Sequence, residues 1–211
     1  LYKVKNLINL GSSCIYPRMA QSPIKEEYLL TGAFEPTNEA YALAKVSALK
    51  MCDFYNRQFG TNFISLMPTN LFGENDNFNM ETAHLLPMVL RRFHLAKLYE
   101  ENNIEAIKHD FSCNPIGWGL DDKINSMKLE DILEKIGIRK GKVALWGNGS
   151  VYRELMSSNQ LADAVLYFLK NIDYKDINGF VNITSGKDIK LSDLFESVKR
   201  IVNYNGEMEY D

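Results

Sequence analysis

A strand–helix–strand order near the start of the chain constrains the fold most. The apolar run Leu7–Ser13 is typical of a buried parallel strand, because a strand covered on both faces is hydrophobic throughout. Apolar residues then recur every three or four positions over Asn38–Phe59, which predicts a helix that Gly60 ends. Phe63–Met67 is expected to form the next strand, with Pro68–Asn70 at its carboxyl end. We therefore predict an α/β fold, and ligands of open α/β sheets bind at that edge.

The rest of the chain continues with helical and strand-like segments and no internal repeat. Helical patterns cover residues 84–98, 128–136, 160–170 and 191–202, and strands are expected at 143–146 and 180–184. Ser192 or Asp193 is expected to cap the last helix.

Composition excludes several functional classes. The 211 residues suit one or two globular domains, and a net charge of −3 gives no footprint for nucleic acid or an anionic membrane. No apolar run reaches the roughly 18 residues of a membrane-spanning helix, and no signal peptide is visible. The cysteines, Cys14, Cys52 and Cys113, are odd in number and widely spaced, which favours a reducing cytoplasm. His109 lies four residues before Cys113 without a second such pair, so we expect no metal.

Tyr41 and Lys45 are four residues apart and share one face of the predicted helix. An ammonium beside a phenol favours the phenolate, and a hydroxyl such as that of Ser12 could share the proton. This arrangement is a tyrosine acid/base for carbonyl–alcohol chemistry. About one such spacing is expected by chance in this composition, so the surrounding motifs must support the assignment. The alternative is a half-buried helix tyrosine.

The motifs around this pair resemble the extended short-chain dehydrogenase/reductase superfamily, and within it the GDP-L-fucose synthase family. The resemblance covers nearly the whole chain apart from residues near 97 to 141. The segments that carry it are Gly11–Pro17 (GSSCIYP), Glu35–Glu39 (EPTNE), Met67–Gly73 (MPTNLFG), His84–Pro87 (HLLP), Leu90–His94 (LRRFH) and Trp146–Gly149 (WGNG).

The resemblance implies a Rossmann-like doubly wound parallel sheet with a smaller α+β substrate domain. Such a fold needs an early glycine-rich turn for the cofactor pyrophosphate, and no G-x-x-G-x-x-G opens a helix here. We therefore expect the N-terminal half of the dinucleotide-binding domain to be missing from this chain. Residues 1–78 would be its second part, and 79–142 substrate-domain helices with an insertion at about 97–141. Residues 143–190 would return to the first domain, and 191–211 would be a C-terminal substrate-domain segment.

The implied activity is that of an NADP-dependent oxidoreductase and epimerase, working as a cytoplasmic homodimer. It would convert GDP-4-keto-6-deoxy-D-mannose to GDP-L-fucose by 3,5-epimerisation and hydride reduction at C4. Tyr41 would protonate the C4 oxygen, Ser12 would hydrogen-bond that oxygen, and Lys45 would hold the nicotinamide ribose. The implied NADP(H)-binding residues are Leu10, Gly11, Ser12, Ser13, Tyr41, Lys45, Pro68, Thr69, Asn70, Leu71 and His84.

Cys14 and His84 match the family's epimerisation residues. Proton removal beside a ketone and its return on the other face need a base and an acid that titrate near neutrality, as histidine and cysteine do. The alternatives are a small buried hydrophobic residue for Cys14 and a surface histidine at a helix N-terminus for His84.

Arg92, Arg153 and Trp146 match positions that contact the substrate. A guanidinium binds phosphate oxygens bidentately, so the arginines are candidate diphosphate clamps, and Trp146 offers a flat face near the nucleotide. The alternatives are a solvated helix face for Arg92 and a core position for Trp146.

Two departures from the family leave other functions open. After Arg153 the family carries a histidine and two acids where this chain reads Glu154–Gln160 (ELMSSNQ), so the local hydrogen bonding differs. The insertion leaves the sugar open, because GDP-heptose epimerase/reductases resemble this subgroup too. A truncated homologue that acts only as a binding protein is the non-enzymatic alternative.

Overall fold

The computed structural model describes residues 3–210. The chain divides into two compact units, the first made of Leu1–Gly73 and Glu154–Lys187 and the second of Glu74–Arg153 and Asp188–Asp211. Within residues 3–210 no helix is both long and apolar enough to span a membrane.

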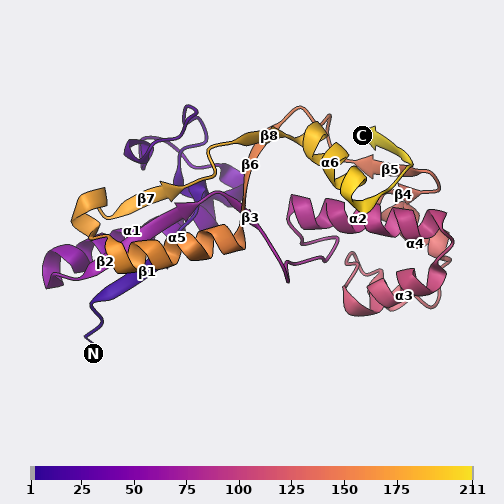
Figure 1. Ribbon diagram of the computed structural model, residues 1–211, viewed down its shortest axis with the longest axis horizontal. Helices are drawn as coiled ribbons and strands as arrows, with labels where there is room; N and C mark the ends of the chain where they lie inside the picture. The colour runs from indigo at the N-terminus through magenta and orange to yellow at the C-terminus, as the bar shows by residue number, and fades with distance from the viewer. Residues whose placement is uncertain (1–2, 211) are drawn as a thin grey trace. The chain divides into compact units, whose positions relative to one another are not determined.

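The first unit contains a three-stranded parallel sheet. Its strands are β1 (Asn6–Leu10), β2 (Asn62–Pro68) and β7 (Phe180–Ile183), in the order β1-β2-β7. The helix α1 (Glu39–Phe59) connects β1 to β2, and α5 (Ser158–Asn171) precedes β7 (Figure 1). The prediction of an α/β fold with parallel strands is confirmed.

The two helices cover opposite faces of this sheet. Val46 and Leu49 of α1 belong to a cluster with Met67, whereas Leu161 of α5 belongs to a cluster with Leu66. Neighbouring residues of a strand point to opposite faces, so Leu66 and Met67 of β2 contact different layers.

The burial predicted for the first strand is wrong. Leu7 and Leu10 are 36% and 44% exposed, because in the part of the chain that the structure describes β1 pairs only with β2 and lies at the sheet edge. Its parallel register with β2, Leu10 opposite Leu66, agrees with the predicted strand–helix–strand unit.

A local sequence signal sets the end of one helix, whereas a tertiary contact sets the start of another. Gly60 ends α1 as predicted, with φ of 60° and its N–H donated to the Asn56 carbonyl at 3.0 Å. The expected cap of α6 (Leu191–Val202) is wrong, because the helix begins before Ser192. The Ser192 N–H instead donates to the Gly149 carbonyl at 2.9 Å, so no side chain is needed there.

The long loop after β1 is anchored on β7. Its short helical turns are η1 (Ser13–Ile15), η2 (Glu26–Tyr28) and η3 (Pro36–Asn38). The buried Tyr16 hydroxyl donates to Asn182 Oδ1 at 2.5 Å, and the Asn182 N–H donates to Glu26 Oε1 at 2.8 Å. Burial raises the pKa of Tyr16 to about 12.

Two short elements follow β2 and α5 in the chain. The strand β3 (Asn70–Phe72) pairs in parallel with β6 (Tyr152–Ser157), with Asn70 opposite Leu155. A short turn, η5 (Tyr174–Ile177), connects α5 to β7.

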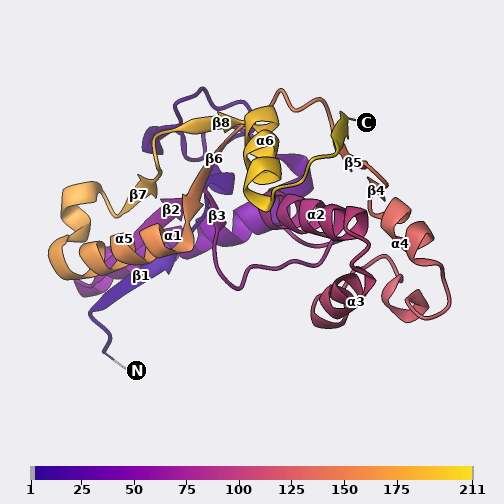
Figure 2. The same cartoon turned by 45° about the vertical axis from the view of Figure 1, so that its right-hand side comes forward.

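The second unit is built around α2 (Leu85–Glu100), with α6 and α3 (Ile104–Cys113) on opposite sides of it (Figure 2). Its sheet has the order β4-β5-β9, with β5 parallel to β9 and antiparallel to β4. The bounds of the other elements are η4 (Asp121–Lys123), α4 (Leu129–Lys135), β4 (Ile138–Arg139), β5 (Lys142–Leu145), β8 (Asp188–Lys190) and β9 (Glu207–Tyr210).

Arg91 holds α3 and the following loop against α2. Its buried guanidinium pairs with Asp110 at 2.7 Å. It also donates to the carbonyls of Phe78, Asn114 and Pro115 at 2.7, 2.8 and 2.6 Å. One side chain thus fixes three segments of the second unit.

Candidate active site

The carboxyl end of β1 is closely packed against β2. The Gly11 N–H donates to the Leu66 carbonyl at 2.8 Å, and a Cβ at Gly11 would collide with Met67 Sδ. The next residue, Ser12, accepts a hydrogen bond from the Cys14 N–H at 3.2 Å and so starts the turn η1. A larger residue here would require the end of the Met67 side chain to move, so glycine suits the point where this backbone leaves the sheet.

Tyr41 and Lys45 of α1 lie beside this strand end. Lys45 Nζ donates to the Leu10 carbonyl at 2.9 Å and lies 5.5 Å from the centroid of the Tyr41 ring. Tyr41 is 46% exposed, which fits both a half-buried helix tyrosine and a residue that meets a ligand. Among the described residues, no hydrogen bond joins its hydroxyl to Ser12 or Lys45, which leaves that hydroxyl open to a ligand.

The side chains after β2 are occupied by structural contacts. Thr69 Oγ1 and Asn70 Nδ2 both donate to the Glu154 carbonyl at 3.2 Å. The Thr69 N–H donates to the Ile183 carbonyl at 3.2 Å, Pro68 ends β2, and Leu71 lies in β3. A cofactor at this loop would meet mainly its backbone.

The altered segment after Arg153 has its own hydrogen bonds. Glu154 Oε1 accepts from the Gly186 N–H at 2.7 Å and from Ser185 Oγ at 3.0 Å. The Ser157 hydroxyl accepts the Gln160 N–H at 3.2 Å, and Gln160 Oε1 accepts the Ser157 N–H at 3.0 Å. This capping box starts α5 at Ser158, two residues before the predicted start.

Cys14 and His84 are both exposed, Cys14 in the first unit and His84 in the second. The alternative of a buried Cys14 is therefore wrong. His84 is the N-cap residue of α2 and makes no side-chain cap hydrogen bond, which leaves its imidazole open to solvent. Their pairing in epimerisation stays a prediction.

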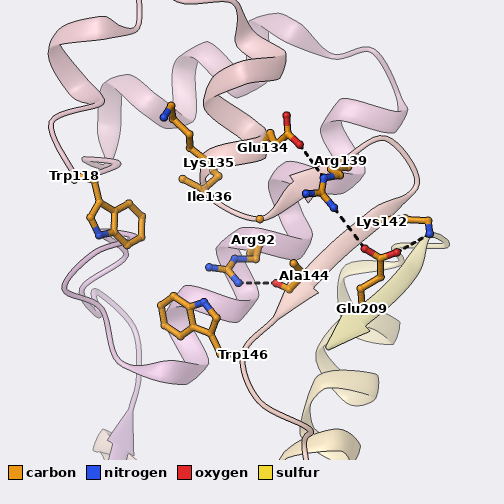
Figure 3. A pocket seen from close by; sticks show the side chains of 11 residues that line it. Arg92, Trp118, Glu134, Lys135, Ile136, Arg139, Lys142, Ala144, Trp146 and Glu209 are labelled. Carbon is orange, nitrogen blue, oxygen red and sulfur yellow. Dashed lines mark hydrogen bonds and ion pairs between the residues drawn. The ribbon is translucent and has the colours of Figure 1, made fainter. Parts of the chain in front are cut away.

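Arg92 lies at the wall of a cavity of about 260 Å³ in the second unit (Figure 3). It is only 2% exposed, so the alternative of a solvated helix face is wrong. One guanidinium nitrogen donates to the Ala144 carbonyl at 2.7 Å, and the guanidinium carbon lies 5.2 Å from the Trp146 ring centroid. Trp146 is 55% exposed and is not a core residue. The residues around the cavity are Arg92, Trp118, Glu134, Lys135, Ile136, Gly137, Arg139, Lys142, Ala144, Trp146 and Glu209.

A row of alternating charges forms one side of this cavity. Arg139 pairs with Glu134 at 3.0 Å and with Glu209 at 3.8 Å, and Glu209 pairs with Lys142 at 2.6 Å (Figure 3). The hydrogen bond to Glu209 raises the pKa of Lys142, and the same bond lowers the pKa of Glu209. The two cations and two anions of this row balance, and Arg92 and Lys135 give the lining an excess of positive charge, which suits an anionic ligand.

The sequence comparison identifies the family. Residues 1–109 match the model of the NAD dependent epimerase/dehydratase family. This chain belongs to that family.

The curated relatives of this epimerase/dehydratase chain include GDP-L-fucose synthases. GDP-L-fucose synthase from Sinorhizobium fredii is 35% identical over 208 residues, and GDP-L-fucose synthase 1 from Arabidopsis thaliana is 39% identical over 208 residues. Each alignment includes 99% of this chain but only 53% and 51% of the relative, respectively, so the chain spans about half the length of the curated relatives it matches.

The solved structures add a second sugar class. A GDP-D-glycero-L-gluco-heptose synthase from Campylobacter jejuni, determined in the presence of NADPH, superposes with a TM-score of 0.87 at 38% identity. The match covers 98% of this chain and 60% of that one. A GDP-6-OMe-4-keto-L-xylo-heptose reductase from C. jejuni gives a TM-score of 0.86 at 38% identity, with 99% and 59% covered.

The motif residues do not all gather in one place. Arg153 is exposed, its guanidinium donates to the neighbouring Tyr152 carbonyl at 2.9 Å, and it is not among the described residues that line the cavity. Conversely, sequence reasoning missed Trp118, Lys135, Arg139 and Lys142. Only Trp118 had a local signal, since it stands between two glycines.

Proposed function

We propose that this chain forms the catalytic part of an NADP-dependent enzyme that reduces the C4 ketone of a GDP-linked 4-keto sugar. The observation that carries the proposal is the contact of Lys45 with both the Leu10 carbonyl and the Tyr41 ring at the end of β1. The family membership and the GDP-sugar enzymes among the relatives give independent support.

The residues at this strand end fit the nicotinamide half of NADP(H). Gly11 offers backbone without a side chain at the point where a Cβ would collide with Met67. The Lys45 ammonium has three protons and gives one to Leu10, so others can reach ribose hydroxyls. When bound, the cofactor supplies the hydride for C4, and the protein handles position and protons.

Tyr41 would deliver the proton to the C4 oxygen. Its side chain is 46% exposed and open to a ligand, and the ammonium of Lys45 lies 5.5 Å from the ring centroid. Ser12 would donate a hydrogen bond to the same oxygen and hold the ketone in place. Lys45 would therefore have two roles, ribose binding and positioning of the Tyr41 ring through the cation–π contact.

Cys14 and His84 would carry out 3,5-epimerisation before reduction. One removes the proton beside the ketone and the other returns a proton on the opposite face, which inverts the centre. Both side chains are exposed, which supports a contact with substrate rather than a packing role.

Arg92 would bind the diphosphate of the substrate. The Ala144 carbonyl and the Trp146 ring hold its guanidinium in one orientation, which reduces the entropy lost when a phosphate binds. Arg153 is a second candidate clamp, supported by its exposed guanidinium and its place in the motif.

Two sugars are candidates. The curated relatives are named GDP-L-fucose synthases, which supports GDP-L-fucose as the product. The sequence resemblance then implies GDP-4-keto-6-deoxy-D-mannose as the substrate. The solved structures favour a GDP-heptose, because two heptose enzymes superpose with TM-scores of 0.87 and 0.86. Turnover of both substrates, followed by NADPH absorbance, decides between them.

The reductase proposal is tested with Tyr41→Phe in the full-length protein. We expect ketone reduction to fall by about 100-fold or more, because a positioned general acid contributes roughly that much. Exchange of the sugar protons with deuterated solvent should persist, since other residues remove them. Tyr55→Phe is the matched control, because Tyr55 is an exposed tyrosine of the same helix that stacks on Phe63. Reduction by Tyr41→Phe at the wild-type rate would show that Tyr41 is not the proton donor.

The epimerase proposal is tested with Cys14→Ser and His84→Gln. We expect a product with fewer inverted centres, as measured by NMR of the isolated sugar nucleotide, while hydride transfer continues. The normal product at the normal rate in both variants would assign both residues to structure.

A further inference from the structure

Trp118 lies on a turn beside the cavity that Arg92 lines. Its backbone has φ of +50°, a left-handed conformation that large side chains rarely adopt, between Gly117 at +89° and Gly119 at +65°. Despite its size it is 44% exposed, and its ring lines the cavity (Figure 3).

Two carboxylates hold this turn. Glu81 Oε2 accepts the Trp118 N–H at 2.6 Å. Asp121 accepts the N–H groups of Ile116 and Gly117 at 2.7 and 2.9 Å. A Cβ at Gly117 would collide with Glu81, so the turn cannot be built with another residue there without displacing that carboxylate. The left-handed tryptophan is therefore fixed by its surroundings.

The Trp118 ring has a face open to a ligand, whereas Arg92 covers part of the Trp146 ring. Arg92 lies over the Trp146 ring, but among the described residues Trp118 forms no aromatic or cation–π pair. A strained, fixed and unstacked aromatic ring beside cationic groups is suited to a planar ring attached to phosphates.

We propose that Trp118 is the wall on which the base of a nucleoside diphosphate stacks. The inference rests on the proposed function and deepens it, because it adds a specificity-determining residue to the nucleotide end of that site. The base would lie on Trp118, and the diphosphate would reach the guanidinium of Arg92. Lys135 adds positive charge along the same cavity, whereas Arg139 and Lys142 are paired with Glu134 and Glu209.

The two tryptophans of the chain allow a direct test by fluorescence. Trp146→Phe leaves Trp118 as the single tryptophan and keeps an aromatic face for Arg92, and Trp118→Phe leaves Trp146. With GDP as the probe, we expect saturable quenching of Trp118 emission in Trp146→Phe. Pyrophosphate, which has no base, should not quench it.

Affinity gives a second readout. Trp118→Asn removes the ring but tolerates the left-handed backbone, so the turn should stay folded. It should weaken GDP binding by about tenfold, the order expected for loss of one base–aromatic stack, and leave pyrophosphate binding unchanged. Trp118→Phe is the conservative control and should bind GDP within about threefold of wild type.

Several results would overturn the inference. One is a GDP affinity of Trp118→Asn equal to that of the wild type. A second is that GDP changes the emission of Trp146 but not that of Trp118. A third is that GDP-mannose, but not GDP, quenches Trp118 emission, which would place the sugar on the ring. Absence of any GDP binding would also overturn it.

GDP affinity and turnover of a GDP-4-keto sugar test the base-stacking role of Trp118 and the proposed reaction separately. If Trp118→Asn loses GDP affinity but the full-length wild type reduces no GDP-4-keto sugar, the proposed reaction is wrong and the base-stacking role of Trp118 stands. If the full-length Trp118→Asn enzyme turns over such a sugar with an unchanged KM, the proposed reaction stands and the base-stacking role is wrong.

Discussion

Tyr16 and Tyr204 are matched buried tyrosines: replacing Tyr16 by phenylalanine should lower stability, whereas replacing Tyr204 should leave it equal or raise it. They are 4% and 3% exposed, and they belong to different units. The Tyr16 hydroxyl donates to Asn182 at 2.5 Å, whereas among the described residues the Tyr204 hydroxyl is buried without a hydrogen-bond partner. The variants are Tyr16→Phe and Tyr204→Phe.

At neutral pH the expected difference comes from hydrogen bonding alone. Tyr16→Phe loses a bond with a net value of about 1 kcal/mol and leaves Asn182 Oδ1 without that donor, so we expect a loss of about 1–2 kcal/mol. Tyr204→Phe removes a hydroxyl whose desolvation is not compensated, so stability should stay equal or rise by about 1 kcal/mol.

In alkali both tyrosines should destabilise the wild type. Burial is the main cause that raises the pKa of each from 10.0 to about 12. Between these values the unfolded chain has lost the phenolic proton and the folded chain still holds it, so the free energy of unfolding falls as pH rises. A rise of the pKa from 10.0 to about 12 lowers the free energy of unfolding by about 2–3 kcal/mol for each tyrosine, and this loss is complete near pH 12.

Urea unfolding followed by circular dichroism, at neutral pH and at steps between pH 10 and 12, measures both effects. Each single variant should lose the contribution of its own tyrosine to the fall in the free energy of unfolding at alkaline pH. The double variant should lose both contributions. An equal loss of stability at neutral pH in the two variants would refute the hydrogen-bond reasoning. An unchanged alkaline slope in the double variant would refute the assignment of the pKa shifts.

Two further sets of variants, at Ser157 and at the ion pairs of Arg91 and Lys108, test what stabilises each unit. Ser157→Ala should cost about 1 kcal/mol by removing the acceptor for the Gln160 N–H, and Ser157→Asp should recover most of it, as measured by thermal unfolding. Arg91→Met should cost about 3–5 kcal/mol because it leaves the carboxylate of Asp110 without its buried partner. Lys108→Met, which breaks an exposed ion pair on the same helix as Asp110, should change stability by less than about 1 kcal/mol. A similar loss in the two ion-pair variants would contradict the role given to Arg91.

Local sequence patterns predicted the elements that local physics determines. The three-to-four-residue period defined α1 to within one residue, and Gly60 ends it because glycine accepts a left-handed backbone without strain. The burial of β1 could not be predicted in this way, since it depends on which strand lies beside it. Short strands such as β3 were missed because their partner, β6, lies far along the chain and leaves no local pattern.

The residues of the candidate site also divide into those that local sequence patterns predict and those that only tertiary packing brings together. Tyr41, Lys45 and the end of β1 were predictable, because a helix face and a strand–helix connection bring them together. The cavity around Arg92 was not, because its walls come from separate segments that only tertiary packing joins. The motif also suggested Arg153 for this site, but the described cavity is formed without it.

The neighbouring arginines of α2 show what position on a helix adds to sequence. Consecutive residues point about 100° apart around a helix, so Arg91 and Arg92 meet different surroundings although both are buried. Arg91 binds Asp110 and three backbone carbonyls and thereby fixes α2 against α3. Arg92 lies against the Trp146 ring and lines the cavity. Because Arg91 fixes the helix, Arg92 is held where a phosphate would meet it, and loss of Arg91 should weaken nucleotide binding as well as stability.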